Sequence, residues 1–390
     1  MTSLELPPEW KLMVLRDFAE VKYGKARPKD TGSIPVIGSG GKYGYTSQAL
    51  VDIPTIVIGR KGTAGLAWLL EQPCWPSDTT FYLHWKDDPI NLYYLYYHLQ
   101  GKPLSGEHAR TTLPSLLKQD LENYSLFVPP LPEQRAIARA LRAVQAAREA
   151  RLREIALERE RKAALMEHLF THGTRGESTK MTEIGEMPES WSMIQLEEAC
   201  IKIVDCPHST PHFSPAGVLV VRNFNIRNGR LDLKSAFYIT EKEYIERIKR
   251  CEPVEGDVLF SREAPVGEAC LVPPDIRLCL GQRMMLLRVD TSKLNRFFLV
   301  QAFYSSAIRS IMMAISSGVT AKHLNVADVK RLRIPFPSTE EQGQISGILS
   351  SCDSKISTLD HEVSLLDELF RTMLEELMSG KLPAKGLIEP

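Results

Sequence analysis

The chain has 390 residues, 43% of them hydrophobic, and its 48 basic residues balance 48 acidic ones. This length is sufficient for two or three domains that each have a hydrophobic core. The formal net charge of zero argues against a non-specific polyanion binder, although a local basic patch can still bind one specifically. The seven cysteines are scattered and form no Cys-x-x-Cys pair, so we expect buried, reduced side chains and a cytoplasmic protein. No apolar run predicts a transmembrane helix, and the first residues do not resemble a secretory signal.

Residues 1–128 predict a mixed domain of short strands and at least one helix. The β-branched run at residues 55–58 is typical of a strand, and Gly and Pro residues separate such runs. Residues 37–44 are rich in glycine and predict a loop. A helix is predicted near residues 88–100, with Asp88 as the N-cap, Pro89 at the first helical position and Gly101 beyond the end.

Residues 129–174 predict a long helix. Apolar positions at alternating steps of four and three run from Ile137 to Leu169, and the helix is expected to end at His172-Gly173. Four positions in the middle of this stripe are polar, so a shift of register toward Leu152 is an alternative.

Residues 175–336 predict a second mixed domain, with a strand at 218–221 and a helical segment at 295–316. Within it, Cys206, His208 and His212 hint at a metal site. One Cys and two His without a fourth ligand form a weak pattern, and a loop with partly buried polar side chains is the favoured interpretation.

Residues 337–380 predict a second long helix, followed by a C-terminal tail at residues 381–390. Its apolar stripe runs from Ile345 to Leu377 at steps of four and three without a break. Ser338-x-x-Glu341 predicts a capping box at its start, and Gly380 predicts its end.

The two halves repeat one another. FVPPLPEQRAIARAL, which starts at Phe127, matches PFPSTEEQGQISGIL, which starts at Pro335, so that Gln134 and Gln342 lie 208 residues apart. We call these two segments the leaders. Trp10 matches Trp191 at an offset of 181 residues, and the offset rises along the chain. The second copy therefore has insertions in its loops.

The two long helices are predicted to pair with each other. Residues 126–176 carry a net charge of +4 and residues 336–390 a net charge of −6, which favours mutual pairing over two ordinary core-facing helices. The connectivity makes the pair antiparallel, and about 35 residues would span roughly 50 Å. We therefore expect an α+β protein in which two similar mixed α/β domains are separated by a long antiparallel two-helix coiled coil, with a pseudo-two-fold internal repeat. Two heads at a fixed spacing suit duplex DNA with two half-sites.

With these features the chain resembles the specificity subunits of type I restriction-modification systems. The resemblance lies in the two leaders, the helix end LMEHLFTHGTRGE and the segments VIGRKGTAG, WPSDTTFYL, LVVRNFNIRNGRLDL and VEGDVLFSREAPVG. It implies two target-recognition domains that each read about half of a bipartite site in double-stranded DNA. It also implies helices that act as a spacer ruler, two docked methyltransferase subunits, and restriction-translocase subunits. S-adenosylmethionine would be bound by the methyltransferase subunit and not by this chain.

No catalytic or metal-binding residue is predicted. The Asn/Asp-Pro-Pro-aromatic loop of a base-flipping amino-methyltransferase is absent from the sequence, and Tyr43 stands where Gly-x-Gly-x-x-Gly needs its last glycine. The main prediction is a non-catalytic DNA-recognition subunit. The alternatives are the equivalent subunit of a related bipartite-site restriction system, a coiled-coil scaffold that bridges proteins without binding DNA, and, least favoured, a self-contained enzyme.

Candidate DNA-binding residues are basic, amide or aromatic side chains on predicted loops. Arg60 and Arg262 occupy equivalent positions, which suits a shared phosphate contact or a shared structural role. The four polar residues of the first helical stripe are candidates for partner docking: Arg148, Arg151, Glu158 and Lys162. The DNA-binding candidates are Lys42, Tyr43, Tyr45, Arg60, Lys61, Arg110, Arg222, Asn223, Asn225, Arg227, Arg262, Gln282, Arg283, Lys322 and His323.

Overall fold

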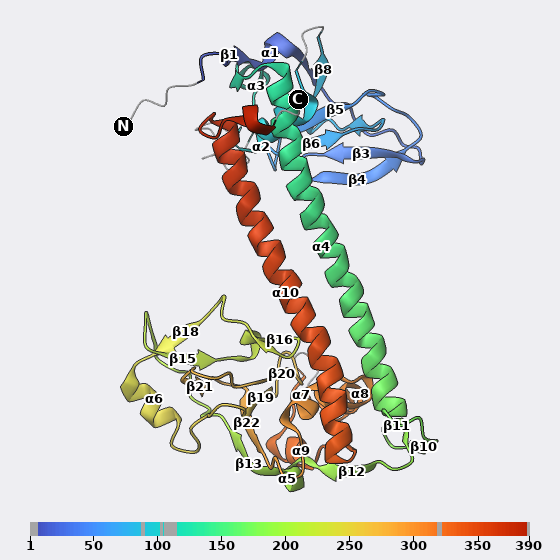
Figure 1. Cartoon of the computed structure of the whole chain (residues 1–390), viewed down its shortest axis with the longest axis vertical. Coiled ribbons are helices and arrows are strands. Elements are labelled where there is room, and N and C mark those ends of the chain that lie inside the picture. Colours follow the sequence, from blue (N-terminus) through green and yellow to red (C-terminus); the bar gives the residue numbers. More distant parts are fainter. Residues whose placement is uncertain (1–6, 87–89, 102–103, 105–114, 318–321, 388–390) are drawn as a thin grey trace. The chain divides into compact units, whose positions relative to one another are not determined.

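The computed structural model describes residues 7–86, 90–101, 104, 115–317 and 322–387. The chain divides into two compact units. Unit 1 comprises Met1–Arg153 and Asp360–Pro390, and unit 2 comprises Glu154–Leu359. Two long helices, α4 (Leu131–His172) and α10 (Thr339–Met378), each contribute to both units and run alongside each other (Figure 1).

Unit 1 is built on two small sheets. The first is antiparallel and has the order β2 (Ala19–Tyr23), β8 (Thr80–Trp85), β5 (Thr55–Gly59), β6 (Ala67–Leu70). The second has the order β4 (Gly41–Thr46), β3 (Ile34–Gly38), β7 (Trp75–Pro76), in which β3 and β7 are parallel. A separate pair, β1 (Lys11–Val14) and β9 (Ser125–Val128), leads into α4. Helices α1 (Leu15–Phe18), α2 (Leu92–Gln100) and α3 (Lys118–Glu122) complete the unit.

Unit 2 repeats this framework. Its antiparallel sheet has the order β13 (Cys200–Asp205), β22 (Met284–Val289), β19 (Val258–Ser261), β20 (Ala269–Leu271). Its second sheet has the order β14 (Phe213–Ser214), β18 (Phe237–Ile239), β15 (Val218–Val221), β21 (Leu278–Leu280), again with one parallel pair, β15 and β21. β12 (Ser192–Gln195) pairs with β23 (Arg333–Phe336) as β1 does with β9. The helices are α5 (Leu196–Ala199), α7 (Arg296–Tyr304), α8 (Ser306–Ile315) and α9 (Val326–Arg331).

The insertions of the second copy add structure between β15 and β19. They form the 3-10 helix η2 (Asn223–Asn225), the hairpin of β16 (Ile226–Arg227) and β17 (Arg230–Leu231), and helix α6 (Glu241–Arg247). Another hairpin, β10 (Thr179–Thr182) with β11 (Gly185–Pro188), follows α4, and the 3-10 helix η3 (Ala384–Leu387) follows α10.

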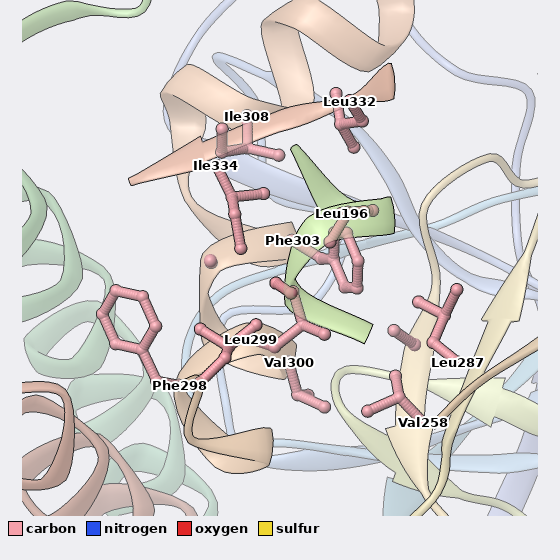
Figure 2. Packing of buried hydrophobic residues seen from close by; sticks show 14 of the residues in the cluster. Leu196, Val258, Leu287, Phe298, Leu299, Val300, Phe303, Ile308, Leu332 and Ile334 are labelled. Carbon is pink, nitrogen blue, oxygen red and sulfur yellow. The ribbon is translucent and has the colours of Figure 1, made fainter. Parts of the chain in front are cut away.

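The largest hydrophobic core lies in unit 2. This cluster includes Leu299 and Phe303 of α7, Leu196 of α5 and Ile334 of β23 (Figure 2), and Phe298 of α7 stacks on Phe170 of α4 with ring centres 5.3 Å apart. These side chains are buried, so α7 is a core helix. Within the described residues no single helix is long and apolar enough to cross a membrane, and the bent pair of α7 and α8 meets that criterion only as a pair.

Local details differ from the sequence predictions at several points. The N-cap of α2 is Asn91, whose side chain accepts from the amide of Tyr94 at 3.0 Å, whereas Asp88 and Pro89 lie outside the described residues. The helical segment after Asn295 is two helices, because Ser305 ends α7 and caps α8. The predicted glycine-rich loop contains strand β4, which pairs with β3.

The long helices end as predicted. Gly173 and Gly380 have positive φ values of 65° and 72°, which favour glycine after a helix. Half of the predicted capping box forms, since the amide of Glu341 donates to Ser338 Oγ at 3.3 Å while the Glu341 carboxylate contacts Trp191 and Thr174. Leu152 is 41% exposed and Ile155 is buried, so the stripe keeps its register and the alternative of a shift toward Leu152 does not hold.

In unit 1, the leader forms the joint between the domain and α4. The indole Nε1 of Trp10 donates to Glu133 at 3.2 Å. Gln134 donates to the carbonyl of Pro129 at 2.9 Å and accepts from the amide of Asn91 at 2.8 Å. Glu133 and Gln134 are buried, so these bonds fix the helix start to strand β9 and to the start of α2.

Unit 2 repeats this joint bond for bond. Trp191 donates to Glu341 at 3.1 Å, Gln342 donates to the carbonyl of Pro337 at 2.9 Å, and the amide of Asn295 donates to Gln342 at 2.7 Å. The Glu-Gln pair therefore occurs in both leaders because each domain attaches its long helix through the same buried contacts.

Candidate nucleic-acid interface

The loops at equivalent ends of the two antiparallel sheets are built by the same backbone hydrogen bonds. In unit 1 the amide of Gly65 donates to Gly59 at 2.9 Å and the amide of Leu116 donates to Arg60 at 2.9 Å. In unit 2 Gly267 donates to Ser261 at 2.9 Å and Leu324 donates to Arg262 at 3.0 Å. Most predicted DNA-binding residues lie on these loops or on strands beside them, so the fold brings them together in each unit.

Arg60 lies on aromatic rings at the end of β5. Its guanidinium carbon is 5.2 Å from the ring centre of Tyr23 and 5.9 Å from that of Phe81. Its Nε is buried without a hydrogen-bond partner among the described residues. Lys61 beside it is exposed. A guanidinium held on aromatic faces keeps its charge available for an anion.

Lys42, Tyr43 and Tyr45 lie on β4, the edge strand of its sheet, and all three are exposed. The register shifts between Val36, which faces Gly44, and Ile37, which faces Lys42, so Tyr43 is the extra residue of a bulge in β4. The Lys42 ammonium is 3.0 Å from the Tyr45 hydroxyl and 5.2 Å from the centre of its ring. An exposed edge with aromatic and basic side chains can contact bases or phosphates. Arg110 lies outside the described residues.

Asn223 and Asn225 do not face solvent. Asn223 is 9% exposed and donates to the carbonyl oxygens of Glu263 and Ala264, and Asn225 is 1% exposed. The Asn225 amide donates to two carbonyl oxygens and accepts from the amide of Arg222 at 3.0 Å. The prediction that these two amides read base edges is therefore wrong, because all of these contacts shape the loop itself.

Arg222 is surrounded by aromatic rings. Its guanidinium carbon lies 4.9 Å from the ring centre of Phe224, 5.5 Å from that of Phe237 and 5.7 Å from that of Phe213. Arg227 on β16 is exposed, so of the four candidates on this segment it is the one most open to solvent.

Arg262 is neutralised within unit 2. Its Nε is 3.1 Å from Asp205, its Nη1 donates to the carbonyl of Leu324 at 3.0 Å, and its side chain is 16% exposed. Of the two roles that its position suggested, the structural one fits these contacts.

The remaining candidates of unit 2 surround Arg262. Gln282 donates to the carbonyl of His208 at 2.8 Å, and Arg283 forms an ion pair with Glu263 at 3.4 Å. His323 bridges to Glu263 through the backbone, and Lys322 is exposed. The structure thus gathers these side chains into one surface, with Arg283 and Lys322 as its accessible cations.

Sequence reasoning missed several neighbours of these surfaces. Tyr23 lies against Arg60, Lys118 lies over the Tyr23 ring, Arg27 donates to the carbonyl of Tyr45 at 3.0 Å, and Asp205 lies 3.1 Å from Arg262. None lies in a recognisable sequence motif. Tyr23 and Asp205 come near the arginines only through strand pairing, of β2 with β8 in unit 1 and of β13 with β22 in unit 2.

The described residues contain no group of three or more His, Cys, Asp or Glu side chains arranged for a metal ion. His212 lies 3.6 Å from Glu243, whereas His208 pairs with Asp205. Burial raises the pKa of the Cys206 thiol, which keeps it protonated. The favoured interpretation of this segment as a loop agrees with these contacts.

The four candidates for partner docking pair α4 with α10. In unit 1 Arg148 lies 2.5 Å from Asp367 and Arg151 lies 2.6 Å from Glu362, so the helices are antiparallel.

In unit 2 Lys162 lies 2.8 Å from Asp353, and the buried Glu158 lies 3.5 Å from Lys355. These charges are used between the two helices, which favours a role in pairing α4 with α10, while the docking face stays a prediction.

A family model described as the type I restriction modification DNA specificity domain matches residues 7–158 and 188–365. The chain is 25% identical over 323 residues to the type I restriction enzyme MjaVIII specificity subunit of Methanocaldococcus jannaschii, covering 80% of this chain and 75% of that protein. It is 24% identical over 360 residues to the type I restriction enzyme EcoBI specificity subunit of Escherichia coli, covering 86% of this chain and 75% of that protein.

Solved structures show the same fold. The S subunit of a type I restriction-modification system from M. genitalium superposes with a TM-score of 0.64 at 16% identity, covering 97% of this chain and 98% of that one. A chain solved in work on complex assembly and conformational transition of the type I R-M system gives a TM-score of 0.55 at 17% identity, covering 97% and 100%. The resemblance carried by the leaders is confirmed, and the chain belongs to the family of type I restriction modification DNA specificity domains.

Proposed function

We propose that this chain is the non-catalytic DNA sequence-recognition subunit of a type I restriction-modification enzyme. One observation carries the proposal: the DNA specificity domain model matches the two halves of the chain separately. In this proposal each matched half is a target-recognition domain, and each reads one part of a bipartite DNA target.

The two domains differ where they would meet DNA, which supports an asymmetric target. β4 of unit 1 presents Lys42, Tyr43 and Tyr45 on an open edge. In the second sheet of unit 2 the corresponding edge of β18 is covered by β14, and the nearby Arg222 is held among phenylalanines. Because specificity depends on which side chains reach base edges, two loops of different composition would read different sequences.

The paired helices are proposed to set the spacer between the two half-sites and to dock two methyltransferase subunits. Exposed leucines on their outer faces support the docking: Leu152 and Leu157 on α4, and Leu365 and Leu369 on α10. The methyltransferase subunits would hold S-adenosylmethionine, and restriction-translocase subunits would complete the enzyme. The free cysteines support a cytoplasmic location for the complex.

The proposal is tested by isolating the tagged chain from its native cells with whatever binds it. The eluate is assayed for S-adenosylmethionine-dependent methylation of mixed-sequence DNA, and the products are mapped. We expect an adenine methyltransferase in about two-fold excess and methylation at one bipartite sequence. A chain isolated with partners that transfer no methyl group would contradict the proposal and favour the bridging scaffold.

Salt dependence separates these two functions further. A DNA-binding subunit releases counterions on binding, so its affinity for duplex DNA falls steeply as salt rises. A scaffold that bridges proteins without touching DNA has no such slope. The matched control is the same titration with the outward-facing leucine variant Leu157→Ala, which we expect to weaken methyltransferase recovery without changing the salt slope.

A further inference from the structure

The framework arginine at the end of the central strand has opposite surroundings in the two units. Arg60 and Arg262 follow β5 and β19, and their backbone amides donate equivalent hydrogen bonds, to the carbonyls of Thr79 and Arg283 respectively, each at 2.9 Å. Their neighbours are therefore directly comparable, position by position.

The edge strand of each antiparallel sheet, separated from the central strand by one other strand, ends in a different residue in the two units. In unit 1 this is Tyr23 at the end of β2, and in unit 2 it is Asp205 at the end of β13. Tyr23 supports the Arg60 guanidinium at 5.2 Å, whereas Asp205 neutralises Arg262 at 3.1 Å. Asp205 therefore offsets the positive charge of Arg262, whereas an aromatic ring that carries no charge lies against Arg60.

The residue after each arginine also differs in charge between the two units. Lys61 follows Arg60 and is exposed, and Glu263 follows Arg262 and pairs with Arg283 at 3.4 Å. Within the described residues neither Arg60 nor Lys61 forms an ion pair.

The short helix that precedes the last strand of each unit begins with a different residue. It is Lys118 in α3 of unit 1 and Val326 in α9 of unit 2. The Lys118 ammonium lies 5.9 Å from the centre of the Tyr23 ring, so two cations share that ring, and Glu122 pairs with Lys118 at 3.4 Å.

We infer that Tyr23, Arg60, Lys61 and Lys118 form a binding site for a DNA backbone phosphate in unit 1, and that the equivalent position in unit 2 has lost this site. We call these four residues the phosphate cluster. The inference rests on the proposed function. Two cations on one half-exposed ring, with the exposed Lys61 next to Arg60 in the chain, suit a compact anion, and the ring holds the guanidinium without neutralising it. In unit 2 an Asp and a Glu take the places of Tyr23 and Lys61, so the arginine serves the fold alone.

The test measures binding of the full chain, in its native complex, to duplex DNA that carries the methylated sequence, over a range of salt concentrations. Arg60→Ala should make the slope of log K against log salt less steep by about 0.9 and weaken binding about eightfold near 0.1 M salt, as expected for one lost phosphate. The methylated sequence should not change. Arg262→Ala should leave the slope unchanged and lower the thermal unfolding midpoint.

Tyr23→Asp reproduces the arrangement of unit 2, so it should reduce the slope as Arg60→Ala does, while Tyr23→Phe keeps the ring and should bind like the wild type. Lys11→Ala, which removes an exposed charge from β1, is the matched control and should leave the slope unchanged. An unaltered slope in Arg60→Ala, or a changed recognition sequence, would overturn the phosphate cluster. A wild-type complex without sequence-specific binding would instead overturn the proposed function.

Discussion

Asn225 shows how a side chain suited to reading adenine can serve the fold instead. Its amide makes hydrogen bonds to Asp232, Ser235 and Arg222 from a position that is 1% exposed. A buried amide that loses its partners leaves polar backbone groups without hydrogen bonds, and such groups are costly. The residue type was compatible with both roles, and burial decides between them.

Asn225→Ala should therefore destabilise unit 2 by about 2 kcal/mol, because the carbonyls of Asp232 and Ser235 lose their donor. Chemical denaturation of the full chain measures this loss. Arg227→Ala, an exposed neighbour on β16, should change the free energy of unfolding by less than about 0.5 kcal/mol. If Asn225→Ala folded with wild-type stability but altered the methylated sequence, the structural role would be refuted.

At the scale of elements, the ion pairs between α4 and α10 explain why the first helix has a polar stripe. Lys162 contacts both oxygens of Asp353 at 2.8 Å, with side chains 16% and 23% exposed. Gln301 donates to the same carboxylate at 3.0 Å. Partial burial makes such a pair costly to break, whereas exposed pairs contribute little.

Lys162→Ala should lower the free energy of unfolding by about 2 kcal/mol, because the Asp353 carboxylate loses its charged partner in a half-buried position. Urea denaturation is the measurement. Arg153→Ala is the matched control on the same helix, since Arg153 is 69% exposed and its contact with Glu149 is 3.9 Å long. If both variants lowered the free energy of unfolding equally, the ion pair of Lys162 with Asp353 would make no specific contribution to stability.

The joint at each leader makes a separate prediction. Gln342 is fully buried and contacts Pro337, Lys293 and Asn295, so Gln342→Ala removes three hydrogen bonds and should cost about 3 kcal/mol. Gln344→Ala, two residues along α10, loses one exposed contact to Thr174 and should cost less than about 0.5 kcal/mol. Thermal unfolding of both variants compares them, and a Gln342→Ala variant as stable as Gln344→Ala would contradict the joint.

At the scale of the whole molecule, two copies of one framework carry different loops and share two continuous helices. The helices begin at identical joints, so helix length can change without altering either domain. The phosphate cluster shows that the domains have also diverged at an equivalent position, from a charged site in unit 1 to a neutralised one in unit 2.

One heptad added to both helices, after Arg153 and after Leu359, should preserve the seam and lengthen the pair by about 10 Å. If the helices set the spacer, the methylated target should gain about 3 base pairs between unchanged half-sites. Methylation mapping reads this directly, and a heptad added to α10 alone is the control, since it should disrupt the pairing. A changed half-site sequence would contradict the spacer role.

Much of the fold was predictable from local signals. The 208-residue offset between Gln134 and Gln342 revealed the repeat, and the step pattern from Ile345 to Leu377 predicted α10. The site was less predictable. The repeat correctly suggested that Arg60 and Arg262 occupy equivalent positions. Their opposite environments depend on Tyr23 in unit 1 and Asp205 in unit 2, and each of these reaches its arginine only after strands distant in sequence have paired.

The sequence by itself determined the duplication, the two long helices and the family resemblance, because periodicity and repeated motifs are written along the chain. Only the tertiary structure decided which polar residues are available to a partner. Asn223 and Asn225 are buried, Arg148 and Lys162 face α10, and Arg262 is neutralised. Burial and charge pairing join residues that are distant in sequence, and the residue type alone does not specify either.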